Sequence, residues 1–168
     1  MKYAVGIALG SNQGDRLRHL QAALDWLKTI SLTPIRYSRV YETAPVECPE
    51  GSLPFLNAVC EITFEGDLLK LLSQMRAFEQ QEGRPLHYPK NAPRPLDLDL
   101  LYAGDLVLES DVLTLPHPRM LQRRFVLQPL SDIRPDLVLP QQTKNVQQHL
   151  TELKDPSQVA LFAGMLNT

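Results

Sequence analysis

The sequence predicts an α+β fold. Stretches with the two-residue period of strands and stretches with the longer period of helices follow one another as strand, helix, strand, strand, helix, strand. This order is typical of a ferredoxin-like layer, in which helices pack on one face of an antiparallel sheet and the other face is left for a ligand. At 168 residues, 43% of them hydrophobic, the chain is long enough for one domain with a real core, and we expect a single domain over residues 1–168.

The amino-terminal part is expected to form a strand, a helix and a second strand. Residues 2–9 are strand-like, and a turn over residues 10–15 leads into a helix whose leucines recur at helical spacing as far as Ile30. Alternating side chains indicate the second strand near residues 34–41. The loop that follows, as far as Pro54, is long enough in a compact domain to suggest a segment that covers a ligand; the alternative is an irregular surface connection.

The middle of the chain predicts a strand, a helix and a further strand. The third strand is expected over residues 55–64, where Asn57 points away from the apolar side chains that face the core. Asp67 is a natural N-cap for the second helix, which is expected to end at Gly83 because glycine is common just after a last helical turn. A proline-rich loop over residues 84–95 then leads to the fourth strand.

The carboxy-terminal part adds smaller elements. A turn near Gly104 separates the fourth strand from short strand signals at residues 106–108 and 112–115, which predict an extra hairpin. Pro118 is expected at the first position of a further helix, where the missing N–H of proline costs nothing. Residues 144–164 are weakly helical. We therefore expect carboxy-terminal helices in addition to the hairpin.

The fourth strand carries the most informative pattern in the chain. Side chains alternate along a strand, so Asp97 and Asp99 point to one side, roughly 6.5 Å apart along the backbone, while the neighbouring leucines enter the core. Two like charges this close repel each other and need a compensating partner, and oxygen ligands of this kind suit Mg²⁺. From the pair alone, two exposed acids on a sheet face open to water are an equal alternative. Asn57 is expected to face the same cleft as Asp97.

Cationic residues surround the acidic strand in the sequence, and guanidinium groups bind phosphate through paired hydrogen bonds. Arg119 and Arg123 are one helical turn apart and are expected to share a face, although a solvated surface pair is an equal interpretation. Taken alone, His117 is more simply an N-cap or a turn residue than a phosphate ligand. Together the acids and cations indicate chemistry on an Mg²⁺-bound nucleotide. The cationic set comprises Arg84, Lys90, Arg94, His117, Arg119, Arg123 and Arg124.

The composition argues against several other classes of protein. The formal net charge of −2 gives no reason to expect nucleic acid or an anionic membrane as a partner. Cys48 and Cys60 are too few for a disulfide scaffold, and with the scattered histidines they show no zinc-ligand spacing. The amino terminus lacks the layout of a signal peptide, and no apolar stretch approaches membrane-spanning length. We therefore expect a cytoplasmic protein in a reducing compartment.

Residues 90–101, with the sequence KNAPRPLDLDLL, closely resemble the signature of the 6-hydroxymethyl-7,8-dihydropterin pyrophosphokinase family of the folate pathway. The resemblance covers most of residues 1–140. It implies a ferredoxin-like scaffold, a monomer, and transfer of the pyrophosphoryl group of ATP to the hydroxymethyl oxygen of the pterin, giving AMP and a pterin diphosphate. The other segments that carry it are residues 8–12, 41–45, 55–58, 82–84, 115–118 and 123–125.

The resemblance also implies roles for individual residues. Asp97 and Asp99 resemble the ligands of two Mg²⁺ ions, and with Arg84 and Arg94 they form the expected catalytic set. The residues that match positions contacting the ATP phosphates are Arg84, Arg94, His117 and Arg123. Those that match positions around the nucleoside are Glu79, Leu100 and Thr114. The expected pterin site consists of Phe55 and Phe125 stacked on the ring, Asn57 at the ring edge, and backbone groups of Thr43 and Val46.

Four positions depart from the family pattern. Asn91 stands where tryptophan is common, Leu86 where arginine is common, Pro118 where an aromatic residue is common, and Arg124 where glycine is common. We expect these departures to change loop closure, and with it turnover and ATP affinity, without changing the reaction. No side chain stands out as a general base.

Two further hypotheses belong to other classes of function. One is a catalytically silent ferredoxin-like module that binds a nucleotide or a pterin as a regulator, which the altered loop positions motivate. The other is RNA binding by the similarly ordered RRM architecture. The sequence disfavours RNA binding, because both the aromatic RNP pattern and a basic sheet are missing.

Overall fold

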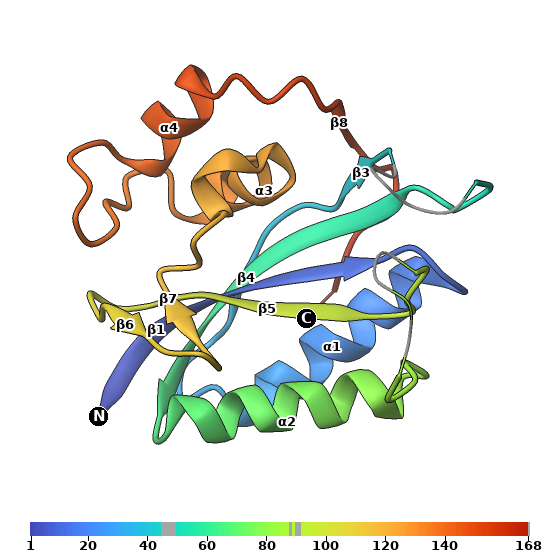
Figure 1. Ribbon diagram of the computed structural model, residues 1–168, viewed down its shortest axis with the longest axis horizontal. Coiled ribbons are helices and arrows are strands. Elements are labelled where there is room, and N and C mark those ends of the chain that lie inside the picture. Colours follow the sequence, from blue (N-terminus) through green and yellow to red (C-terminus); the bar gives the residue numbers. More distant parts are fainter. Residues whose placement is uncertain (45–49, 88, 90–91, 168) are drawn as a thin grey trace.

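A computed structural model describes residues 1–44, 50–87, 89 and 92–167. Its centre is an antiparallel sheet with the strand order β5-β1-β4-β3-β8, in which β2 also pairs with β4 (Figure 1). The two long strands β1 and β4 pair from Lys2 opposite Glu65 to Ser11 opposite Leu56. The predicted α+β class with an antiparallel sheet is therefore confirmed. The strands are β1 (Lys2–Ser11), β2 (Arg36–Tyr37), β3 (Tyr41–Thr43), β4 (Phe55–Glu65), β5 (Asp97–Ala103) and β8 (Val159–Leu161).

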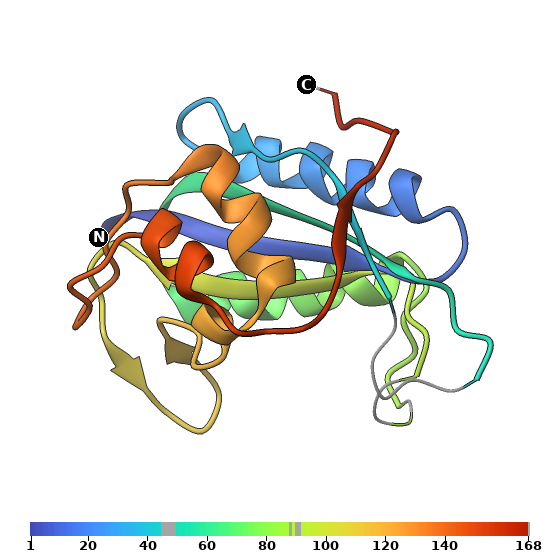
Figure 2. The ribbon, with the colours of Figure 1, turned by 90° about the horizontal axis from the view of Figure 1, so that it is seen from above.

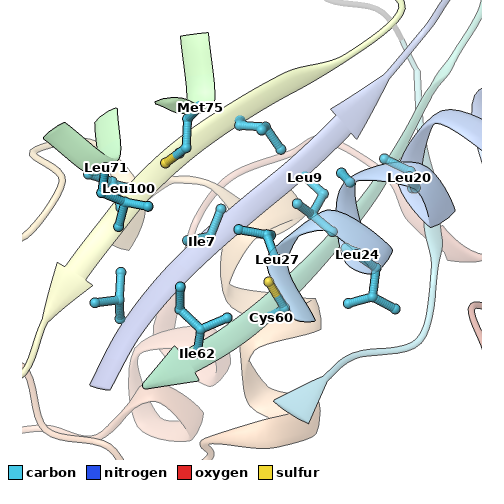
Figure 3. Close-up of a cluster of buried hydrophobic side chains, with 14 of the residues drawn as sticks. Ile7, Leu9, Leu20, Leu24, Leu27, Cys60, Ile62, Leu71, Met75 and Leu100 are labelled. Carbon is cyan, nitrogen blue, oxygen red and sulfur yellow. The ribbon is translucent and has the colours of Figure 1, made fainter. Parts of the chain in front are cut away.

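One face of the sheet is covered by α1 (Arg16–Ile30) and α2 (Leu68–Gln81). Both helices begin after an aspartate, and the predicted N-cap role of Asp67 is confirmed: its carboxylate accepts a hydrogen bond from the Leu69 N–H, as that of Asp15 does from the Arg18 N–H. Their leucine stripes meet the apolar side chains that alternate along the strands, as Figure 3 shows. The predicted assignment of strand faces is confirmed by this core, which includes Ile7, Leu9, Leu24, Leu27, Cys60, Ile62, Leu71, Met75, Leu98 and Leu100.

The other face of the sheet also carries helices, so the expectation that helices pack on one face only is wrong. The helices α3 (Arg124–Ile133) and α4 (Val146–Glu152) lie on the opposite side from α1 and α2 (Figure 1). They cover apolar residues that the strands direct to that side, and burial of this surface favours the arrangement. Only part of this face is left open for a ligand. The second core consists of Val59, Leu101, Tyr102, Met120, Val126, Leu127, Leu130, Leu139, Val146 and Leu150.

Three other elements differ from the sequence prediction. The strand expected over residues 34–41 is divided into β2 and β3. The helix expected to start at Pro118 starts instead at Arg124, because extended backbone at Arg123 separates it from a single 3₁₀ turn over Met120–Gln122. The weakly helical tail contains only the short α4, and Val159–Leu161 forms strand β8 on the edge of β3.

The remaining segments include the extra hairpin that the sequence predicts. The predicted hairpin is formed by β6 (Leu108–Glu109) and β7 (Thr114–Leu115). Within the described residues, the model contains no helix of the length and apolar character that a bilayer crossing requires. Figure 2 shows the last segment of the chain running from α4 across the edge of the sheet.

Candidate active site

A cavity of about 840 Å³ opens on the part of the sheet face that α3 and α4 leave uncovered. Its wall is built from strands β1, β3, β4 and β5 and from the segments around α3. Most of the residues predicted from the sequence meet there, although they come from distant parts of the chain. The predicted residues that line the cavity are Thr43, Phe55, Asn57, Arg84, Arg94, Asp97, Asp99, His117, Arg123 and Phe125.

The two aspartates occupy adjacent outward positions of β5. Asp97 pairs with Gly10 of β1, and Asp99 pairs with Ala8, so small residues lie beside both carboxylates. A methyl group at Gly10 would lie 3.5 Å from Asn57 Oδ1 and 3.9 Å from Asp97 Cβ. Because glycine has no side chain, residue 10 places no side-chain atom in the cavity between Asp97 and Asn57.

Asp97 is neutralised by two arginines on the cavity wall. Its carboxylate accepts a hydrogen bond from Arg84 Nη1 at 2.7 Å and another from Arg94 Nη1 at 3.4 Å. Asn12 fixes the backbone of Arg94, since the Arg94 N–H donates to Asn12 Oδ1 at 2.8 Å and the Asn12 N–H donates to the Arg94 carbonyl at 3.1 Å. The loop that carries Arg94 is thus tied to the end of β1.

Glu79 lies behind these arginines and lines neither of the two cavities near the site. Its side chain is 2% exposed and accepts hydrogen bonds from Arg84 Nη1 at 3.0 Å, Arg76 Nη1 at 2.9 Å and the Leu98 N–H at 2.7 Å. Burial raises the pKa of Glu79, while the neighbouring Arg76 opposes that rise. Glu79 therefore positions the cations beside the acidic strand from within the protein.

Asp99 carries a clear electrostatic perturbation within the cavity. Burial, and then the negative charge of Asp97, raise the pKa of Asp99 to about 6. A cation between the two carboxylates would relieve both effects. Within the described residues, no cluster of three or more His, Cys, Asp or Glu is arranged to hold a metal ion. A bare carboxylate pair nevertheless fits Mg²⁺, which usually takes one or two carboxylates and completes its shell with water and phosphate oxygens.

His117 and Arg123 supply donors on the other side of the acids. Burial and the charges of Arg123 and Arg119 lower the pKa of His117, so the imidazole is neutral at pH 7. Its Nδ1 accepts the Arg119 N–H at 3.1 Å, which assigns the ring proton to Nε2. Burial lowers the pKa of Arg123, whose guanidinium has no hydrogen-bond partner among the described residues. Both groups are therefore open to an anionic acceptor.

The remaining part of the cavity is aromatic and amide-lined. Phe55 starts β4 and Phe125 lies in the first turn of α3. Arg94 stands 5.7 Å from the centre of the Phe55 ring, and Arg123 stands 5.4 Å from that of Phe125. Between these elements, Asn57 Nδ2 donates to Thr43 Oγ1 at 2.7 Å. The cavity thus joins a flat apolar end to a charged end.

Two predicted nucleoside residues line a smaller adjoining cavity of about 230 Å³. Leu100 and Thr114 belong to its wall, and Arg76 and His117 border both cavities. Of the departures from the family pattern, Pro118 also borders both cavities, and Leu86 is 73% exposed and lines neither. Val46 and Asn91 lie outside the described residues.

Several cavity residues were not assigned to the site from the sequence. Arg119 was recognised only as a possible phosphate-binding cation, and Arg76 was not singled out, although it lies one turn before Glu79. Asp155 and Ser157 gave no signal, because the tail that contains them was predicted only to be weakly helical. The additional lining residues are Ala8, Leu9, Gly10, Ala44, Ala58, Arg76, Pro118, Arg119, Asp155 and Ser157.

Comparison with known proteins identifies similar chains. A family model described as 7,8-dihydro-6-hydroxymethylpterin-pyrophosphokinase (HPPK) matches residues 6–135. The chain is 38% identical over 135 residues to 2-amino-4-hydroxy-6-hydroxymethyldihydropteridine pyrophosphokinase of Haemophilus influenzae, covering 80% of this chain and 83% of that protein. It is 39% identical over 163 residues to folic acid synthesis protein fol1 of Schizosaccharomyces pombe, covering 96% of this chain and 22% of that protein.

A longer plant relative and a solved structure are also similar to the chain. The mitochondrial folate synthesis bifunctional protein of Arabidopsis thaliana is 40% identical over 134 residues, which are 79% of this chain and 24% of that protein. The chain thus spans about a fifth to a quarter of the length of these fungal and plant relatives. The structure of wild-type HPPK-DHPS of Plasmodium falciparum with pteroate superposes with a TM-score of 0.69 at 15% identity, covering 90% of this chain and 42% of that one. This last likeness concerns the fold alone.

Proposed function

Because the chain belongs to the 7,8-dihydro-6-hydroxymethylpterin-pyrophosphokinase family, we propose that it transfers the pyrophosphoryl group of ATP to the hydroxymethyl oxygen of 6-hydroxymethyl-7,8-dihydropterin. The products are AMP and the pterin diphosphate, an intermediate of folate synthesis. One observation carries the proposal beyond family membership: a single cavity joins a carboxylate pair, several cationic side chains, two phenylalanines and a buried amide. These are the groups that a metal-bound triphosphate and a flat heterocycle require.

The apolar end of the cavity suits the pterin. Phe55 and Phe125 offer flat apolar faces for offset stacking on the ring. Asn57 is only 6% exposed, and its amide offers both a donor and an acceptor to the mixed hydrogen-bonding edge of a pterin. Its bond to Thr43 fixes the amide orientation, so Asn57 is poised to read that edge.

The charged end of the cavity suits a triphosphate. Five arginines and three aspartates line the whole cavity: Arg76, Arg84, Arg94, Arg119 and Arg123, with Asp97, Asp99 and Asp155. The surplus of positive charge attracts ATP, and guanidinium groups bind phosphate oxygens through paired hydrogen bonds. Neutral His117 adds a donor through Nε2. Phosphoryl transfer depends mainly on such positioning and charge neutralisation, so these residues supply most of what the protein must provide.

Mg²⁺ is part of the same proposal, with Asp97 and Asp99 as its protein ligands and two ions expected. When bound, the ions neutralise the phosphate chain and lower the cost of bringing it beside two carboxylates. Arg84 and Arg94 balance the charge of Asp97 in the free protein and are the groups that can turn to phosphate oxygens once the substrates bind. His117 is a poor candidate for general base, since its Nδ1 already accepts a backbone N–H.

The test is to mix the protein with ATP, Mg²⁺ and the hydroxymethyl dihydropterin and to identify the nucleotide product. AMP and the pterin diphosphate are expected, and omission of the metal with excess chelator is expected to stop the reaction. Formation of ADP would contradict the proposed transfer. Binding of both ligands without turnover would favour the silent regulatory module. Glu109→Gln removes an exposed acid that lines neither cavity and serves as the control.

The predicted strand arrangement, domain organisation, oligomeric state and location also belong to this proposal. The order β5-β1-β4-β3 supports a ferredoxin-like arrangement of the central strands. A single domain over residues 1–168, a monomeric state and a cytoplasmic location stay predictions. The location in particular needs its own measurement, because two similar plant proteins are named as mitochondrial.

A further inference from the structure

The segment after α4 reaches the cavity although it follows the residues that match the family model. We refer to residues 153–161 as the strap. It leaves the end of α4, runs past α3 and joins the sheet edge as β8 (Figure 2). Asp155 and Ser157 of the strap line the cavity together with Phe125 and Thr43.

One end of the strap is held by Arg124. The Arg124 N–H donates to Asp155 Oδ2 at 3.1 Å, and its guanidinium Nη2 donates to the carbonyls of Leu153 and Asp155, both at 3.3 Å. The second oxygen of Asp155 accepts the Ser157 N–H at 2.9 Å, which closes a turn inside the strap. Arg124 directly precedes Phe125, so the same backbone that presents this ring also fixes the strap.

The other end of the strap is held by the sheet. Val159 pairs with Thr43 in the antiparallel ladder of β8 and β3. Thr43 is the residue that accepts the hydrogen bond from Asn57. Beyond the strap, the Phe162 N–H donates to the Val40 carbonyl at 2.9 Å. The strap therefore spans from Phe125 to the Thr43–Asn57 pair, and these are the groups of the apolar end.

The charges in the strap favour the position in which Arg124 holds one end and strand β3 holds the other. Burial opposes the charge on Asp155, but backbone hydrogen bonds from Ser157 and Arg124 outweigh it and lower the pKa of the carboxyl group. Asp155 is thus ionised at neutral pH, and the nearby positive charge of Arg124 also favours the ionised form, although the guanidinium itself donates to the carbonyls of Leu153 and Asp155. The Ser157 side chain also interacts with the Asp155 carboxylate and adds to the lowering of its pKa.

We propose that the strap is the outer wall of the pterin end of the cavity, and that Arg124 is a positioning residue that holds this wall against Phe125. The inference rests on the proposed function, because it names the part of the site that the pterin occupies. It also gives a role to one departure from the family pattern: arginine in place of glycine at position 124 supplies the side chain that binds the strap.

The test compares Arg124→Ala, Arg124→Lys and Ser157→Leu in the full chain. Pterin binding is titrated in the presence of Mg²⁺ and an unreactive ATP analogue, and binding of the analogue is titrated alone. Arg124→Ala is expected to weaken pterin binding about tenfold, since it removes two hydrogen bonds from a charged donor. Arg124→Lys, which keeps one cationic donor, is expected to recover part of this loss. Binding of the ATP analogue should stay within about twofold in every variant.

If Arg124→Ala fails to fold, Ser157→Leu still tests whether the strap forms the wall of the pterin site. The larger side chain adds volume to the proposed wall, and it is expected to weaken pterin binding while leaving the analogue unaffected. Lys144→Ala is the control, because Lys144 also pairs with a carboxylate near α4 but lines neither cavity. The control should bind both ligands like the unaltered protein.

The outcomes separate this proposal from the proposed function. Unchanged pterin affinity in both Arg124→Ala and Ser157→Leu would overturn the role of the strap, and so would an equal loss for pterin and analogue. An unaltered protein that binds pterin but forms no AMP would contradict the proposed function alone. An unaltered protein that does not bind pterin would contradict both.

Discussion

At the scale of single residues, the free site is held in an unfavourable electrostatic state. Asp97 and Asp99 lie on one face of β5, and among the described residues arginine partners at hydrogen-bond distance are found for Asp97 but not for Asp99. The raised pKa of Asp99 records the cost of leaving its charge beside that of Asp97 in a buried position. Under the proposed Mg²⁺ binding, a cation between the two carboxylates would recover the stability given up in the free protein.

The first prediction concerns Asp99→Asn in the presence of a chelator. The pKa of Asp99 is about 6 in the folded protein against an ordinary value of 3.8, so the folded state holds its proton more tightly than the unfolded state. Its contribution to stability is therefore favourable below pH 3.8 and is lost as the pH rises through about 6. Asp99→Asn removes this loss. We expect the variant to melt above the unaltered protein at pH 8, with the difference shrinking as the pH falls below 4.

Thermal unfolding followed by circular dichroism across this pH range checks the prediction. Each kcal/mol gained corresponds to about 2–4 °C in Tm for a chain of this size. Glu109→Gln, an exposed acid outside both cavities, should show no such pH-dependent gain. Equal melting temperatures of Asp99→Asn and the unaltered protein at pH 8 would contradict the inference that the buried charge of Asp99, beside that of Asp97, destabilises the fold.

The second prediction concerns the role of Asp97 in turnover. Asp97→Ala removes one of the two proposed metal ligands and leaves Arg84 and Arg94 without their shared carboxylate. We expect the rate of AMP formation to fall at least about 10²-fold, because the charge on the phosphate chain is no longer neutralised in the right place. The fold should persist, since loss of one charge from a repelling pair does not disrupt the strand. A folded variant with near-normal turnover would refute the assignment.

At the scale of elements, the central strand β1 depends on glycine at two positions for different reasons. A methyl group at Gly6 would collide with the ring of Tyr102 on the neighbouring strand β5. Tyr102 cannot move away easily, because it is 1% exposed and its hydroxyl donates to Glu61 at 2.5 Å. At Gly10 the nearest atoms lie at 3.5 Å or beyond, which is ordinary contact.

The third prediction compares Gly6→Ala with Gly10→Ala. Gly6→Ala is expected to lose about 1–3 kcal/mol of stability through overpacking of the strand pair. Gly10→Ala is expected to keep its stability but to weaken substrate binding, because the new methyl group rises from the cavity floor beside Asn57. Denaturant unfolding and ligand titration on both variants separate the two effects. A stable Gly6→Ala variant would show that the strands can spread apart.

The elements that sequence alone predicts well are those set by local periodicity. Alternation along β4 and β5 places Asn57 and Asp97 on the cavity side, and the leucine spacing and aspartate caps place α1 and α2. The misplaced elements depend on distant contacts. Strand β8 exists because it pairs with β3, and α3 begins late because the backbone at Arg123 is extended. Neither condition leaves a local pattern in the sequence.

The side chains of the site likewise fall into those that a local pattern predicts and those that distant contacts bring to the site. The carboxylate pair and the arginines near it could be predicted, because they are close together in the chain and their chemistry is distinctive. Glu79 was expected on the cavity wall, yet it is buried among its own donors, an uncommon place for a glutamate. Asp155 reaches the site only through the path of the strap. Such contacts follow from the packing of the whole chain and not from any motif.

At the scale of the whole molecule, the two layers of helices are joined by the last residues of the chain. After β8, Phe162 packs against the core between the sheet and α1, and Arg16 lies 5.8 Å from the centre of its ring. The Asn167 N–H donates to Gln21 Oε1 at 2.8 Å. The chain therefore runs from α4 on one face, around the sheet edge, to α1 on the other. Stability of this final segment should contribute to the stability of the entire fold.

The fourth prediction tests this coupling with two neighbouring side chains. Leu166 is 5% exposed and belongs to the main core, whereas Met165 is 71% exposed. Leu166→Ala is expected to cost about 2 kcal/mol or more, because it removes buried methyl groups and leaves a cavity. This corresponds to a fall in Tm of about 4–8 °C. Met165→Ala, one residue away, should leave the melting temperature unchanged.

A single unfolding transition is expected in both variants if the two faces of the sheet form one cooperative unit. Circular dichroism reports the helices, and the fluorescence of Trp26 on α1 reports the first layer, where its ring stacks on Phe78 at 4.8 Å. Coincident melting curves from the two probes would show that loss of Leu166 weakens both layers together. If the Trp26 signal alone shifted, the final segment would stabilise only the α1 side, and the two layers would be energetically independent.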